Sequence, residues 1–167
     1  MNEKTRNKEN VIMIVRNEAG EIKGIHKSKN IVTDAGDLFY AQKGCSASPT
    51  NAFANCKLGT ATAAEGKAST YATLTVITGS EKAPTATYPK VNDTDTDNTG
   101  KAADSITYKY EWAGADFNDA AIACGGIIVA AASGTDPLLT HFKFTAAFAK
   151  TATDTLTLYV NHNFLGV

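Results

Sequence analysis

The hydrophobic positions near the start of the chain predict a β-hairpin. Residues 11–15 (VIMIV) form a continuous apolar run rich in β-branched residues, which is typical of a strand buried on both faces. Residues 17–20 (NEAG) follow as a turn that ends in glycine. Residues 21–29 are predicted to form the second strand of the hairpin. Their alternation of apolar and polar residues shifts by one position between Ile22 and Ile25, and a β-bulge at Gly24 would bring both isoleucines to the same face.

Alternation of apolar and polar residues predicts further strands in the second half of the chain. Along residues 106–112, isoleucine, two tyrosines and a tryptophan share one face, while threonine, lysine and glutamate occupy the other. Three more segments are predicted to be strands: 122–130, 138–144 with Leu138, Phe142 and Phe144 inward, and 154–164 with Leu158 on the apolar face.

The first half of the chain contains weaker strand signals and one helix. Residues 34–43 are predicted to form a short helix, because Thr33 is a good N-cap and an aspartate follows in the first turn. Residues 55–59 and 71–78 have strand character, whereas residues 44–54 are predicted to be loop.

These elements predict an all-β fold, a β-sandwich or jelly-roll with an N-terminal hairpin and one short helix. Residues 79–104 combine prolines with a long polar run and are predicted to be an exposed loop. The length of 167 residues favours one domain. We therefore expect a flexible N-terminal arm at residues 1–10 and a single sandwich domain at residues 11–167.

The composition argues against three classes of protein: general nucleic-acid binders, membrane-spanning proteins and secreted proteins. Sixteen Lys and Arg residues against 17 Asp and Glu give a formal net charge of −1, so the chain lacks the basic excess of a general nucleic-acid binder. The apolar runs are too short for a membrane span, and the run at 11–15 is too short for a secretory signal. We therefore expect no nucleic-acid partner, no membrane, and synthesis and retention in a cytoplasm.

The three cysteines argue against a disulfide framework, because their number is odd and no secretion signal accompanies them. A bridge between Cys45 and Cys56 stays open as the less favoured alternative. Cys124 has no partner in this interpretation.

The strongest candidate for chemistry is a run of aspartates in the long loop. Asp93, Asp95 and Asp97 alternate, and Asp104 occupies the twelfth position from the first of them, a spacing that resembles a calcium loop of the EF-hand type. The sixth position holds Asn98 instead of glycine, the twelfth residue is shorter than the usual glutamate, and no amphipathic helix flanks the run. A weak calcium loop and a solvated, like-charged loop both stay open, and we favour the second.

Other candidate motifs fall short of known sites. Residues 59–69 contain Gly66 and Lys67 but lack the spacing of a phosphate-binding loop, so we expect a flexible loop of small residues. The histidines fall in separate predicted strands, and none has a partner at zinc spacing: His26, His141 and His162. His162 is expected to be a hydrogen-bonded core or interface residue. We predict no enzymatic activity, no cofactor, and no catalytic, cofactor-binding or metal-binding residues.

Two surface features could bind a partner. Trp112 with Tyr108 and Tyr110 could form a stacking platform for a sugar or a base, although aromatic residues at strand spacing are more often core. Residues 1–30 carry a net charge of +3 and residues 91–104 a net charge of −3. These opposite charges are either a frayed terminus and a solvated loop or complementary contacts between neighbouring copies in an assembly.

One segment resembles a known family. Residues 30–41 (NIVTDAGDLFYA) resemble the N-x-V-T-D-x-G stretch near the start of small tailed-bacteriophage virion proteins. Residues 58–60 (LGT) resemble the L-G-T segment that follows in those proteins, and residues 154–160 resemble their alternating final strand. The resemblance implies a β-sandwich that serves as a structural component of the head or tail.

The resemblance leads us to expect a non-enzymatic capsid decoration or cement protein that is oligomeric and located in the virion after assembly in the host cytoplasm. Its partners would be the major capsid protein or other virion proteins. A tail, neck or fibre component is the first alternative. A carbohydrate- or cell-surface-binding module is the second, and it would place Trp112 or Tyr110 at the surface.

Overall fold

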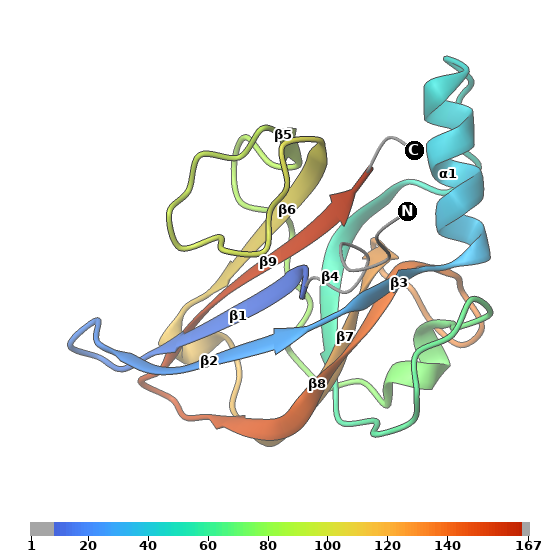
Figure 1. The fold of residues 1–167 in the computed structure, drawn as a ribbon. Coiled ribbons are helices and arrows are strands. Elements are labelled where there is room, and N and C mark those ends of the chain that lie inside the picture. Colours follow the sequence, from blue (N-terminus) through green and yellow to red (C-terminus); the bar gives the residue numbers. More distant parts are fainter. Residues whose placement is uncertain (1–8, 165–167) are drawn as a thin grey trace.

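The nine strands found within residues 9–164, the part of the chain described by the computed structural model, form two antiparallel sheets (Figure 1). The five-stranded sheet has the order β2 (Ile22–Ser28), β1 (Val11–Arg16), β9 (Thr155–Asn163), β6 (Ser105–Trp112) and β5 (Lys90–Val91). The four-stranded sheet has the order β3 (Asn30–Val32), β8 (Leu138–Lys150), β7 (Asp119–Val129) and β4 (Phe53–Gly59). The predicted all-β sandwich is confirmed, and a jelly-roll connectivity stays a prediction.

The N-terminal hairpin forms where the pattern predicts it. β1 pairs with β2 on one side and with β9 on the other, so it lies inside the sheet. The register of the hairpin shifts where Val15 faces Gly24 and Arg16 faces Ile22, which leaves Lys23 as the extra residue of a bulge next to the predicted position. Both faces of β1 are buried, in agreement with its continuous apolar run.

The core lies between the two sheets. Strands β6 and β9 pair along their whole length and place their large apolar side chains inward, as their alternation predicts. Their partners in the core come from β1, β4, β7 and β8. The aromatic members of the cluster are Phe53, Tyr108, Tyr110, Trp112, Phe117, Phe142, Phe144 and Phe148, and Met13, Leu156 and Leu158 pack among them.

Each sheet is also covered on its outer face by a connecting segment. The 60–78 segment covers the four-stranded sheet, where Leu74 packs with Cys124, Ile128 and Leu138 in a second apolar cluster. On the five-stranded sheet, Ile12, Ile14 and Tyr159 form a third cluster. The loop at 92–101 lies over this third cluster, because the Tyr159 hydroxyl donates to Asp95 and Gly100 approaches the backbone of residues 9 and 10.

The structure corrects the prediction of a strand at 71–78. Tyr71–Leu74 form a 3-10 helix, η2, and Thr75 follows with a φ angle of 48° in the left-handed region. The first two backbone N–H groups of η2 donate to carbonyls in the turn between β7 and β8, so they are not free to join a β-ladder. Val76 then makes a single bridge to Gly59.

Three other boundaries differ from the sequence-based expectation. β4 begins at Phe53, inside the predicted loop; β7 begins at Asp119, before its predicted start, and β8 continues to Lys150, beyond its predicted end. Leu138 was expected to face inward with Phe142, but it lies in the outer cluster. The reason is a register shift opposite Ile127 and Ile128, which changes the face on which the following residues of β8 lie.

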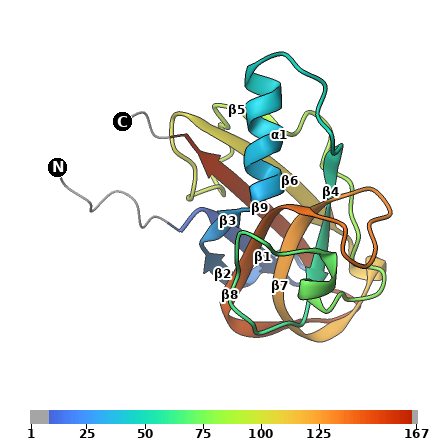
Figure 2. The same cartoon turned by 90° about the vertical axis from the view of Figure 1, so that its right-hand side faces the viewer.

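Helix α1 (Asp34–Gly44) forms as predicted and projects from the sandwich (Figure 2). The Thr33 side chain caps it by accepting from the backbone N–H of Gly36 at 3.1 Å. Gly36 lies so close to the four-stranded sheet that a Cβ atom would meet the carbonyl oxygen of Leu139 at 2.1 Å. Among residues 9–164 no helix is both long and apolar enough to cross a membrane.

Candidate functional site

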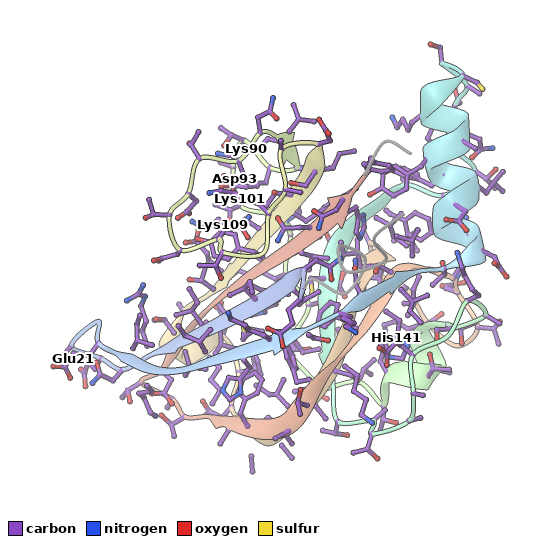
Figure 3. All side chains as sticks on the ribbon, in the orientation of Figure 1. Glu21, Lys90, Asp93, Lys101, Lys109 and His141 are labelled. Carbon is purple, nitrogen blue, oxygen red and sulfur yellow. The ribbon has the colours of Figure 1, made fainter. Side chains whose placement is uncertain are left out.

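The aspartate run at 93–97 lies on the outer face of the five-stranded sheet, where lysines surround it (Figure 3). The Asp93 carboxylate is fully buried and accepts from the Tyr88 hydroxyl at 2.9 Å and from the Asn98 side chain at 2.9 Å. Lys90 lies 3.1 Å away. Burial alone would raise the pKa of Asp93, but these hydrogen bonds outweigh it and lower the pKa to about 2.

The next two aspartates are also paired within the chain. Asp95 accepts from Lys109 at 3.1 Å and from the Tyr159 hydroxyl at 2.6 Å, and Asp97 pairs with Arg16 at 2.8 Å. Asn98, at 1% exposure, exchanges two hydrogen bonds with Asn161 in the sheet below. The loop is therefore an ordered cover that is fixed to the sheet, and the prediction of a wholly exposed, solvated loop is wrong for its central part.

This geometry leaves little room for a calcium ion. The protein's own ammonium and guanidinium groups already occupy positions beside the three carboxylates, and Asp104 contributes its backbone carbonyl to Phe164 at the end of β9. Within residues 9–164 no three His, Cys, Asp or Glu side chains come together as metal ligands. The same pairing neutralises the acidic charge that the sequence suggested as a contact surface.

The histidines lie in three separate environments. His26 stacks on Phe148 with ring centroids 3.9 Å apart. His162 is buried, and its Nδ1 bonds to the hydroxyl of Tyr40 on α1, so it is a hydrogen-bonded core residue as expected. Burial lowers the pKa of His162 to about 3.

Ser69 and His141 form a pair that resembles part of a catalytic triad. The Ser69 Oγ lies 2.9 Å from Nδ1 of His141 and also accepts from the backbone N–H of Gly66 at 3.1 Å. Within the described residues, His141 Nε2 is buried without a hydrogen-bond partner, so no carboxylate orients the ring. In a catalytic triad the serine bonds to one ring nitrogen and a carboxylate accepts from the other. Among residues 9–164, His141 has the serine but lacks the carboxylate. The pair fixes the 66–69 turn to β8.

The three aromatic residues that could have formed a stacking platform belong to the core, which was the favoured interpretation of their spacing. Tyr108, Tyr110 and Trp112 are each at most 2% exposed. The Tyr110 hydroxyl donates to the carbonyl of Ala54 at 2.7 Å, and Trp112 Nε1 donates to the carbonyl of Ser80 at 2.8 Å. These rings are therefore not available to a sugar or a base.

The other sequence candidates also have structural roles. All three cysteines are free, with Cys45 exposed and Cys56 and Cys124 buried, so the alternative bridge between Cys45 and Cys56 is wrong. Lys67 of the near-miss phosphate loop pairs with Asp37 at the start of α1.

The sequence reasoning missed a groove of about 380 Å³ beside α1. Phe39 and Lys43, one turn apart on the helix, form one wall, and Phe53, Pro89 and Tyr108 contribute to the others. The Lys43 ammonium lies 5.9 Å from the centre of the Phe39 ring. Of the residues that line the groove, the sequence could have indicated Phe39 and Lys43, because their spacing of four places them on the same face of a helix. The other wall residues come from distant segments of the chain.

No family model, curated protein or solved structure matches the chain.

Proposed function

We propose that this chain is a non-enzymatic structural component of a tailed-bacteriophage particle, and specifically a capsid decoration or cement protein. The observation that carries the proposal is a contrast between buried titratable side chains and exposed apolar side chains. The titratable side chains of Asp93, His162 and Lys150 are buried, and each is hydrogen-bonded to another group of the protein. Large apolar side chains are instead exposed: Ile22, Ile25, Leu38, Val91 and Phe164. Exposed apolar side chains of this size gain free energy when they are buried against a neighbour.

The segments that carry the family resemblance have a clear structural use. Thr33 and Gly36 of the N-x-V-T-D-x-G segment join α1 to the four-stranded sheet through a helix cap and a close backbone approach. Gly59 of the L-G-T segment has a similar role, because a Cβ atom there would meet the Leu74 carbonyl oxygen at 2.0 Å. These constraints support a shared fold, and they support the structural role that the resemblance implies.

A tail, neck or fibre component is the alternative within the same class, and the same surface would serve it. The burial of Tyr108, Tyr110 and Trp112 counts against a sugar-binding module built on these rings.

Antibody labelling of purified virions of the encoding phage tests the proposal. A cement protein gives label over the whole head surface. Label confined to the neck, tail or fibres assigns the protein there and overturns the decoration role. Virions that carry no label, although the antibody detects the protein in the infected cell, overturn the structural role altogether.

A further inference from the structure

We propose that copies of this chain join end to end, with the β1–β2 hairpin tip of one copy seated in the groove beside α1 of the next. The inference names a partner for the proposed assembly role and rests on that role. Figure 1 shows the hairpin turn and α1 at opposite ends of the molecule, and Figure 3 labels Glu21 at the tip. Because the two surfaces differ, the contact is heterologous, and its repetition builds a ring or a filament.

The other surfaces of the sandwich are less suited to contacts between copies. The outer faces of both sheets are covered by the 60–78 and 92–101 segments, so copies cannot stack through bare sheets. The edge of β2 that is not paired with β1 lies beside β8, and it carries Lys23, Lys27 and a bulge, which are features that protect an edge strand from pairing with another chain. The hairpin tip and the groove beside α1, in contrast, each combine apolar groups with a charge that has no ion-pair partner within residues 9–164.

The charges of the two ends are complementary. Glu18 and Glu21 lie at the hairpin tip, and neither forms an ion pair within residues 9–164. The cations nearest to them in sequence are already used, because Arg16 pairs with Asp97 and Lys23 with Asp154. At the groove, Lys43 contacts the Phe39 ring and has no carboxylate partner in the described part of the chain. An acidic tip thus faces a basic groove wall.

The apolar side chains of the two ends are complementary as well. Ile22 stands next to the tip and is 49% exposed. The groove presents Phe39, Pro49 and Phe53 to an incoming side chain. Ile22 directly follows Glu21, so one insertion of the tip would bury the apolar side chain in the groove and bring the Glu21 carboxylate close to Lys43 on the groove wall.

Sedimentation velocity of the purified full chain tests the contact. We expect the weight-average mass to rise above that of the monomer between concentrations on the order of 10 and 500 µM, since small interfaces are weak. The rise is expected to shrink in 1 M NaCl, where charges are screened within about 3 Å. A chain that stays monomeric over this range overturns the proposal.

Charge reversal identifies the surfaces. Glu21→Lys and Lys43→Glu should each weaken association about fivefold, and the double variant should recover it. Lys27→Glu changes net charge as Lys43→Glu does but lies outside both ends, and it should have no effect. Failure of the double variant to recover association overturns the pairing of these two residues.

An apolar pair of variants provides a second, independent test. Ile22→Ser should weaken association about tenfold. Ile25→Ser is the matched control, because Ile25 is 50% exposed on the same strand but lines the seam between β2 and β8. Equal effects of the two variants contradict docking through the tip.

These measurements separate the contact from the proposed function. A chain that labels virions but stays monomeric in solution retains its structural role and loses this contact. A chain that associates through the tip and the groove but never labels virions keeps the contact and loses the role.

Discussion

Lys150 is charged, yet it is only 1% exposed at the end of β8. Its ammonium group donates to the carbonyl oxygens of Gly114 and Phe117 at 2.8 Å and of Thr151 at 3.2 Å. The Phe117 ring lies 5.2 Å from the same nitrogen. A buried charge is tolerated when its donors are satisfied in this way. One side chain thus ties β8 to the turn at η3 (Gly114–Asp116).

Lys150→Met is expected to lower the free energy of unfolding by about 3 kcal/mol, because it keeps the length of the side chain but removes the ammonium donor from the carbonyl groups of Gly114 and Phe117. Urea denaturation followed by fluorescence of the single tryptophan measures this change. The control Lys27→Met replaces an exposed lysine and should change stability by less than about 0.5 kcal/mol. Equal stability of the two variants contradicts the role of Lys150.

The buried histidines make stability depend on pH. Burial lowers the pKa of His162 to about 3 and also lowers the pKa of His141 and His26 below 6.5. Between the lowered pKa of a folded-state histidine and its ordinary value of 6.5, the unfolded chain binds a proton that the folded chain does not. The free energy of unfolding therefore falls as the pH drops below about 6.5. His162 contributes up to about 1.4 kcal/mol per pH unit in this window.

His162→Gln is expected to reduce this slope by about one proton between pH 4.5 and 6. Unfolding free energies at several pH values in this window measure the slope. The carboxylates with lowered pKa, Asp93 and Asp154 at about 2, lose their contribution only below about pH 4 and do not interfere. An unchanged slope in the variant would show that His162 titrates normally in the folded state.

At the scale of elements, β9 is the strand on which the sandwich depends most. It lies between β1 and β6, with Leu158 opposite Met13 on one side and Tyr110 on the other. Leu158→Asp places an unpaired charge in the core and should unfold the protein, because the cost of about 5 kcal/mol or more equals the stability of many domains.

Circular dichroism and thermal melting show the outcome for Leu158→Asp. Thr155→Asp on the same strand is the control, since Thr155 is exposed and faces Arg16 across the sheet. We expect it to melt within a few degrees of the unmodified protein. A folded Leu158→Asp protein would mean that the register of β9 differs from the one described.

The 92–101 loop should be insensitive to calcium. Its carboxylates are held by Lys90, Lys109 and Arg16, so neither a chelator nor added calcium is expected to shift the melting temperature by more than about 1 °C. Differential scanning fluorimetry in EDTA and in calcium chloride checks this expectation. A decrease in EDTA that calcium reverses would establish the loop as a metal site.

The local pattern of apolar and polar residues predicts the strands and the helix of this fold better than it predicts the contacts between residues that are distant in sequence. The alternation along β6 and the Thr33 cap of α1 each act within one segment, and both follow from neighbouring residues. The pairing of Asp95 with Lys109 and Tyr159 joins residues that are distant in sequence, so no periodicity reveals it. The 71–78 segment has strand propensity, but its backbone groups bond to the β7–β8 turn, and this tertiary contact decides its structure.

At the scale of the whole molecule, the described core begins at Val11, and the backbone of Asn10 bonds to both Ser28 and Asn161. Residues 1–8 lie outside the described part of the chain. Deleting them should leave the fold intact, with a melting temperature within about 2 °C, because every core residue stays in place. The shortened chain is expected to enter virions less well, and labelling against the full chain measures this loss. A shortened chain that does not fold contradicts the expectation.

The pairing of β1 with β9 determines the direction in which the sandwich resists mechanical force least. The backbone N–H of Asn161 donates to the carbonyl of Asn10 at 2.9 Å, so the start of one strand and the end of the other meet at one corner. Tension applied at these two residues would break the hydrogen bonds between the strands one after another, as a zipper opens. A load that compresses the sandwich sideways would therefore leave these hydrogen bonds intact, whereas a load that pulls Asn10 away from Asn161 would open them.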